Sequence, residues 1–106
     1  MVNAAELQLN NRAMQQNARK AVNLLKGLAN ENRLMLMCVL CEGELSVGAL
    51  NERIPLSQSA LSQHLAVLRE QGLVRTRREG QTIYYSLVDS PALKVIQLLH
   101  DEFCPV

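Results

Sequence analysis

The chain has 106 residues, 48% of them hydrophobic, and its 11 basic residues nearly balance its 10 acidic ones. This length suits one domain, residues 1–106, with a hydrophobic core of its own, and the composition is unlike that of a disordered chain. Two tyrosines and one phenylalanine are too few for a platform that stacks single-stranded bases, and the small net charge argues against a polyanion binder without sequence preference.

The sequence has no feature that directs it into or across a membrane. No apolar run reaches the roughly 20 residues of a membrane span, and the N-terminus lacks the basic start and apolar core of a signal peptide. We therefore expect a cytoplasmic protein with no membrane partner. Three cysteines in such a reducing compartment do not indicate a disulfide framework.

Two helices are predicted in the N-terminal part of the chain. Residues 1–16, where Asn, Gln and Ala are frequent, form either a frayed tail or the first turns of a helix. An apolar helical stripe becomes clear between Ala18 and Ala29. The run LMLMCVLC over residues 34–41 is apolar on every side, which predicts a helix buried all round, with Asn30 as the N-cap.

A pair of helices is predicted next, each starting at a serine. Ser46 and Ser57 are the expected N-caps, because a serine side chain can accept a hydrogen bond from the backbone at a helix start. Pro55 ends the first helix of the pair. The second helix runs to about Gln71, with Gly72 just past its end.

The periodicity changes from Leu73 onward. Two short runs rich in β-formers flank Glu79-Gly80, which predicts a hairpin with a charged tip. A last helix, capped by Asp89 or Ser90, has more apolar residues than one monomer face needs, so we expect a second copy of the chain as its partner. The fold class is thus mainly α with a small β-hairpin wing, a winged helix-turn-helix in the order α-α-α-α-β-β-α.

The second helix of the pair has a short, uncharged polar face near its N-terminus. At 100° per residue, Leu61, Leu65 and Leu68 lie on the buried stripe, and small polar residues lie opposite. In a DNA major groove, Gln can pair with adenine, and Ser can bond to bases or phosphate. The alternative is an ordinary solvated face, which would be richer in Glu and Lys. The candidate base-contacting residues are Gln58, Ser59, Ser62 and Gln63.

Four further residues are candidates for contact with the DNA backbone. The helical wheel places His64 beside the leucine stripe, so a boundary histidine and a phosphate contact are both open. Arg75, Arg77 and Arg78 lie on the predicted hairpin, next to the proposed recognition helix, and are the natural backbone or minor-groove contacts. Their alternative role is strand-edge charge, which discourages aggregation.

Three segments of the chain are, when taken together, characteristic of one protein family: LKGLANENRL, SQSALSQHLAVLREQGLV and the hairpin segment GQTIYYSL. Together they resemble the ArsR/SmtB family of small dimeric winged-helix transcription regulators, over about Ala21 to Cys104. The resemblance implies a homodimer formed mainly through the first and last helices. It also implies a function in binding double-stranded DNA, for which we expect a near-palindromic operator.

Two metal sites of that family are incomplete in this chain. Its Cys-Val-Cys motif is replaced by Ser-Val-Gly at residues 46–48, and Pro91 stands where a histidine ligand of the other zinc site would fall. The resemblance is closest to the HlyU-type, metal-independent branch, which includes thiol sensors of oxidants and reactive sulfur species. It implies that Cys38 and Cys104 are redox-sensing residues, and that the protein activates virulence-type genes by relieving their silencing.

The cysteines leave other interpretations open. Cys38 and Cys41 can be small core residues. Cys38, Cys41, His100 and Cys104 also offer the ligand types of zinc, which would make the protein a zinc-responsive repressor. A winged helix that binds protein in place of DNA is a further alternative. A CxxC oxidoreductase would need a βαβ context that this chain lacks, so we expect neither an enzyme nor a bound cofactor.

Overall fold

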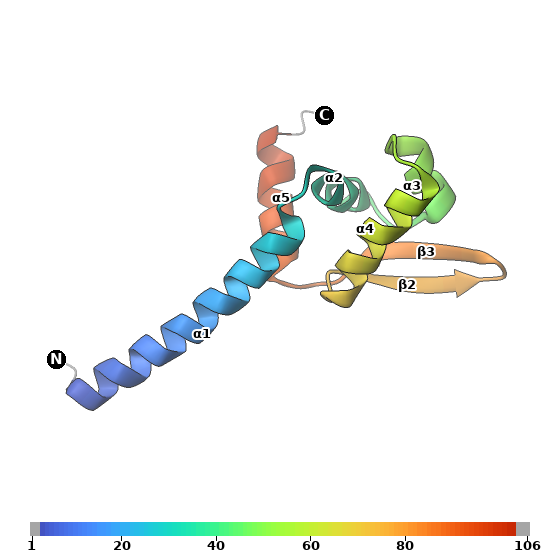
Figure 1. Ribbon diagram of the computed structural model, residues 1–106. Coiled ribbons are helices and arrows are strands. Elements are labelled where there is room, and N and C mark those ends of the chain that lie inside the picture. Colours follow the sequence, from blue (N-terminus) through green and yellow to red (C-terminus); the bar gives the residue numbers. More distant parts are fainter. Residues whose placement is uncertain (1–2, 104–106) are drawn as a thin grey trace.

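The computed structural model describes residues 3–103, and for Leu9 the backbone alone. The elements are, in chain order, α1 (Ala4–Leu28), α2 (Glu31–Leu40), β1 (Leu45–Ser46), α3 (Val47–Arg53), α4 (Gln58–Glu70), β2 (Val74–Glu79), β3 (Thr82–Leu87) and α5 (Pro91–Phe103) (Figure 1). The predicted winged helix-turn-helix order is confirmed, with one added short strand, β1.

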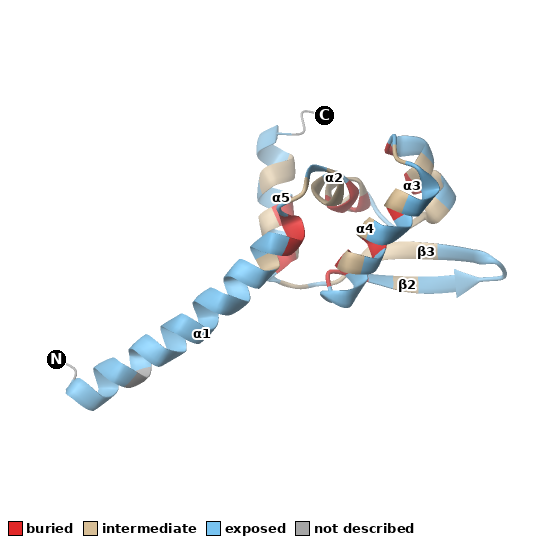
Figure 2. Cartoon of the chain, viewed as in Figure 1, coloured by how far each residue is buried: buried red, intermediate tan, exposed pale blue. Residues whose placement is uncertain are grey.

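Helix α1 is continuous from Ala4, so the frayed-tail alternative for residues 1–16 is wrong within the described part of the chain. Asn3 accepts a hydrogen bond from the Glu6 backbone at 2.8 Å, and the Glu6 carboxylate accepts one from the Asn3 backbone, forming a capping box. Most of α1 extends away from the rest of the molecule and is exposed (Figure 2). No helix within residues 3–103, including the long α1, is both long and apolar enough to cross a membrane.

The C-terminal end of α1 is fitted closely to the rest of the molecule. Gly27 is buried, and a Cβ atom at this position would overlap the side-chain amide of Gln71, which follows α4. The Arg33 guanidinium donates to the backbone carbonyls of Gly27 and Lys26, at 2.7 and 3.2 Å. These bonds satisfy acceptors that the end of a helix leaves open, and they join α1 to α2.

Three of the predicted helix caps are confirmed. The side chains of Asn30, Ser46 and Ser57 accept hydrogen bonds from the first turns of α2, α3 and α4, at 3.0, 3.1 and 3.2 Å. The cap predicted at Ser90 is not formed by its hydroxyl, which is buried without a hydrogen-bond partner among the described residues. The Ser90 carbonyl instead accepts from the Leu93 backbone at 2.9 Å.

The core forms where α2 meets α1, α4, α5 and strand β3, and α3 contributes Leu50 to it. The three leucines of the predicted stripe on α4 are buried, each at 1% exposure or less. The prediction that α2 is buried all round is wrong in part. Leu36, Met37 and Leu40 are buried, but Met35 is 37% exposed, because one side of α2 faces solvent in the single chain.

The small sheet has the antiparallel order β1-β3-β2. Gly80, with a φ of 63°, lies in the turn between β2 and β3, where a left-handed backbone favours glycine. Strand β1 pairs with the other edge of β3, with Leu45 opposite Tyr85 and Ser46 opposite Tyr84. Because Ser46 also caps α3, this two-residue strand joins the hairpin directly to the helix-turn-helix.

The end of α4 depends on a glycine in the left-handed region. Gly72 has a φ of 72°, and no atom lies within 4 Å of a Cβ built on it. Gly72→Ala should therefore reduce the free energy of unfolding by about 1 kcal/mol through backbone strain alone. Urea denaturation at one fixed protein concentration measures the change. The matched control is Gly48→Ala within α3, which should be neutral or stabilising, and equal behaviour of the two variants would contradict the assignment.

Candidate nucleic-acid interface

Helix α4 presents its predicted polar face to solvent. Gln58, Ser59, Ser62 and Gln63 are all exposed, and they occupy the first two turns of the helix. We call these four residues the polar face. No acidic residue lies in the first turn, where the helix N-terminus favours anions. The face can therefore approach a polyanion without repulsion and offers amide and hydroxyl groups to base edges.

A wide cleft of about 980 Å³ separates α4 from the hairpin. Gln58 and Ser62 line it on the α4 side, and Ile83 and Tyr85 line it on the hairpin side. Arg69, which is not among the candidate residues predicted from the sequence, also lines the cleft. Arg69 follows Ser62 by seven residues, about two helical turns, and this spacing is the sequence signal that could have included it. The open shape suits an extended polymer better than a small enclosed ligand.

His64 lies at the edge of this surface. It is half-buried on α4 beside the leucine stripe, as the helical wheel predicted, and it does not belong to the cleft lining. His64 is therefore less accessible than the exposed polar face, although it is adjacent to Gln63 in the sequence.

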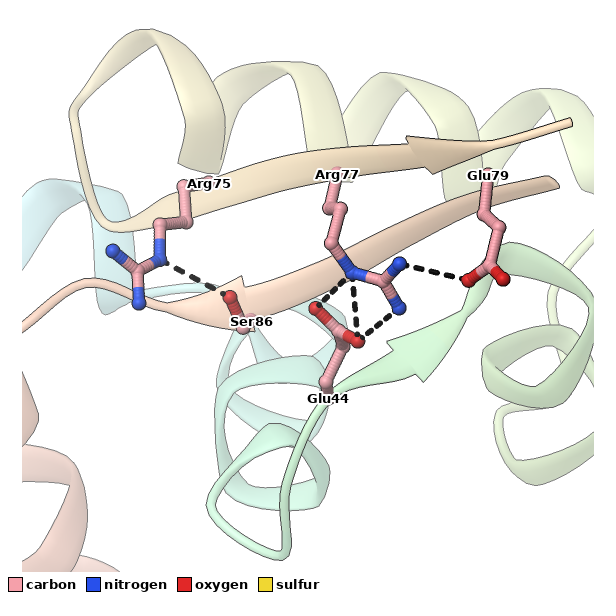
Figure 3. Close-up of polar contacts among 5 residues, drawn as sticks. All are labelled: Glu44, Arg75, Arg77, Glu79 and Ser86. Atoms are coloured by element: carbon pink, nitrogen blue, oxygen red, sulfur yellow. Dashed lines mark hydrogen bonds and ion pairs between the residues drawn. The ribbon is translucent and has the colours of Figure 1, made fainter.

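The three arginines of the hairpin do not share one face. Side chains alternate along a strand, so Arg75 and Arg77 project from one face of the sheet and Arg78 from the other. Arg78 stands opposite Ile83, which lines the cleft, so Arg78 lies on the face that looks toward α4. Arg75 stands opposite Ser86, and its Nε donates to the Ser86 hydroxyl at 3.4 Å (Figure 3).

Arg77 is held by two carboxylates. Its Nε lies 3.2 Å from both carboxylate oxygens of Glu44, and its Nη2 lies 2.7 Å from Glu44 Oε1 (Figure 3). Its Nη1 donates to Glu79 Oε2 at 2.8 Å, and its Cζ lies 4.5 Å from the centroid of the Tyr84 ring. The hydrogen bond to Glu44 is the main cause that raises the pKa of Arg77, and the same bond lowers the pKa of Glu44.

The described cysteines lie together near the end of α2. Cys38 is within the helix and Cys41 is its C-cap, and both are half-buried against the core. Cys104 lies outside the described residues. Cys41 and His100 line a small cleft of about 210 Å³. Within residues 3–103 no three His, Cys, Asp or Glu side chains are grouped so that they could hold a metal ion, so Cys38, Cys41 and His100 do not form such a site.

Residues 30–76, from the N-cap of α2 into β2, match the sequence model of a protein family described as bacterial regulatory protein, arsR family. The transcriptional activator HlyU of Vibrio cholerae is 53% identical over 96 residues, which are 91% of this chain and 89% of that protein. This chain belongs to the arsR family. The structure of reduced HlyU from Vibrio cholerae matches it with a TM-score of 0.85, over 89% of this chain and 99% of that one.

A second solved structure supports the same conclusion. The crystal structure of the transcriptional repressor BigR from Xylella fastidiosa has a TM-score of 0.82 at 45% identity, and covers 89% of this chain and 93% of that one. The predicted DNA-binding transcription regulator is therefore confirmed, as is its winged helix-turn-helix fold, and the protein is not an enzyme.

The contribution of the Arg77–Glu44 pair to folding stability should depend on pH. The Glu44 carboxyl should titrate below the ordinary glutamate value of 4.5, because Arg77 favours its charged form. A lowered pKa in the folded state means that the pair stabilises the fold above that ordinary value, and that its contribution is lost as the pH falls through the folded pKa. In Arg77→Gln the pKa of Glu44 should rise toward its usual value, as measured by carbon-13 NMR of the side-chain carboxyls.

Glu42 serves as the internal reference for that titration. Its pKa is lowered by a different arginine, Arg53, whose Nη2 lies 2.8 Å from Glu42 Oε2. The titration of Glu42 should be the same in both proteins. A Glu44 pKa that is unchanged in Arg77→Gln would contradict the assignment of the shift to Arg77.

Proposed function

We propose that the polar face of α4 contacts the bases of a specific operator, while the hairpin contacts the DNA backbone. The observation that carries this proposal is an exposed, uncharged face at the start of α4, beside an open cleft. His64, at the edge of that face, is assigned to a phosphate. Arg75 and Arg78 are assigned to the backbone because neither forms an ion pair with a carboxylate within residues 3–103.

We propose that the regulator acts as a homodimer. Large apolar side chains are exposed on α1 and α5, where Leu25 is 51%, Leu98 is 63% and Phe103 is 76% accessible. Exposed apolar surface of this kind is typical of a partner interface. A two-fold dimer would bind a near-palindromic operator whose half-sites lie one or two helical turns apart, roughly 10 or 20 base pairs.

The regulatory effect that we propose is activation, of virulence-type genes as the sequence resemblance implies. The Vibrio cholerae relative, at 53% identity, is a transcriptional activator. The Xylella fastidiosa relative, at 46% identity over 86% of this chain and 80% of that protein, is a biofilm growth-associated repressor. The higher identity of the activator supports our choice.

We infer that oxidation or persulfidation of Cys38, with Cys104 as its partner, modulates DNA binding. Cys38 is on α2, α2 packs against α5, and Cys104 is the next residue after the end of α5. Formation of a disulfide would remove two electrons and two protons from the two thiols, and hydrogen peroxide would accept them and become two water molecules. The bond would tie α2 to α5, and α2 supports the recognition helix α4.

Replacement of Gln63 tests the base contacts. Gln63→Ala should weaken operator binding by about 1–3 kcal/mol and leave binding to random DNA nearly intact, since only base contacts distinguish the two. Fluorescence anisotropy with an operator selected from genomic fragments measures both affinities. Gln8→Ala, which removes the same side chain from the exposed part of α1 that extends away from the rest of the molecule (Figure 2), is the matched control and should change neither.

Two outcomes would contradict this proposal. Equal losses of Gln63→Ala on operator and random DNA would remove the base-contact assignment. Absence of binding to any genomic fragment at low salt would favour a winged helix that binds protein instead.

Replacement of Cys38 tests the thiol proposal. Peroxide or polysulfide should release the wild-type protein from its operator, with a mass change at Cys38, and Cys38→Ser should remain bound after the same treatment. Cys41→Ser is the matched control and should still be released. Release of DNA while mass spectrometry finds Cys38 unmodified would contradict the proposal.

A further inference from the structure

We infer that Arg77 is a positioning residue, which holds the hairpin against the helix-turn-helix through Glu44 and does not itself contact the DNA backbone. This inference rests on the DNA-binding surface proposed above. It separates Arg77 from Arg75 and Arg78, with which the sequence pattern groups it.

The side chain of Arg77 reaches across the whole sheet. Arg77 is on β2, and its register partner on β3 is Tyr84, whose ring lies beneath the guanidinium. Tyr84 is in turn paired with Ser46 on β1, and Glu44 precedes Ser46 by two residues. The bonds to Glu44 therefore connect β2 with the chain entering β1, over the top of β3 (Figure 3).

The hydrogen-bonding groups of Arg77 are already directed at carboxylates. Nε and Nη2 face Glu44, and Nη1 faces Glu79, so all three guanidinium nitrogens have an acidic acceptor. Arg75 projects from the same face and also acts on Glu44, so the two arginines and the two carboxylates of this face carry no net charge. A phosphate that approached Arg77 would meet no excess of positive charge there and would have to displace charge-assisted hydrogen bonds.

The position of Glu44 explains what the contact would hold in place. Ser46, two residues after Glu44, is the N-cap of α3. On α3, the Asn51 side-chain amide donates to the Leu56 carbonyl at 2.9 Å, in the turn that leads into α4. The chain from Glu44 to α4 is thus a short, hydrogen-bonded path. The Arg77–Glu44 contact sets the position of the hairpin relative to the polar face at the other end of this path.

Exposed ion pairs contribute little to folding stability, so the effect should appear in DNA binding. For random duplex DNA, the slope of log K against log salt concentration falls in magnitude by about 0.9 for each phosphate that the protein ceases to neutralise. Arg78→Gln should show that fall. Arg77→Gln should keep the wild-type slope but weaken operator binding about tenfold, within the range of coupling between neighbouring residues.

Two results would overturn the inference. A fall in slope for Arg77→Gln as large as that for Arg78→Gln would make Arg77 a phosphate-binding residue. An Arg77→Gln protein with unchanged slope and unchanged operator affinity would show that Arg77 has no positioning role. These slopes do not depend on which side chains contact bases, so failure of the Gln63→Ala test would be distinguishable from failure of this one.

An exchange of the Glu44 and Arg77 side chains distinguishes a positioning role of Arg77 from a direct contact with DNA phosphates. In the double variant Glu44→Arg/Arg77→Glu, one arginine again meets two carboxylates, because Glu79 stays in place, and the net charge is unchanged. We expect Arg77→Glu alone to weaken operator binding and the double variant to recover it to within about threefold of wild type. A double variant as weak as Arg77→Glu alone would overturn the inference.

The matched control is an ion pair that does not join the hairpin to the helix-turn-helix. Arg53 and Glu42 are 2.8 Å apart, and both are exposed, as are Arg77 and Glu44 in large part. Arg53→Gln should leave the salt slope and the operator affinity unchanged. A loss of operator affinity equal to that of Arg77→Gln would show a general charge effect and would overturn the positioning role.

Discussion

The burial of the leucine stripe of α4 determines which other residues of this helix are exposed to solvent. Leu61, Leu65 and Leu68 are almost completely inaccessible, which fixes the rotation of α4 about its own axis. With these three residues inside, Ser59, Ser62 and Gln63 can only face outward. The same burial, of side chains worth roughly 1.5–3 kcal/mol each, therefore both stabilises the fold and selects the residues of α4 that face outward.

Features that depend on neighbours in the sequence could be predicted, and those that depend on distant partners could not. The caps at Asn30, Ser46 and Ser57 follow from contacts within three residues, so their pattern is visible in the sequence. Strand β1 has two residues, too short to show a period of two, and it forms only because β3 provides a partner edge. Its pairing is what makes the hairpin part of the same body as α3.

Arg77 is the particular residue for which the sequence pattern was insufficient. Its partner Glu44 lies 33 positions away, and nothing in the local sequence indicates that they meet. The alternation of side chains along a strand predicts that Arg77 and Arg78 lie on opposite faces of the sheet. It does not predict which of these faces is directed toward α4. The tertiary structure decides it, because Ile83, which stands opposite Arg78, lines the cleft. Charge alone therefore does not separate the hairpin arginine that is paired with carboxylates from Arg75 and Arg78.

Helix α2 connects the proposed thiol site with the proposed DNA-binding surface. It carries Cys38, packs against α4 and α5, and contributes Leu36, Met37 and Leu40 to the core. A bond between Cys38 and Cys104 would act on α2 from the side of α5. A displacement of α2 would be passed to α4 through the core side chains that the two helices share, so the proposed thiol site would act on the proposed DNA-binding surface through packing.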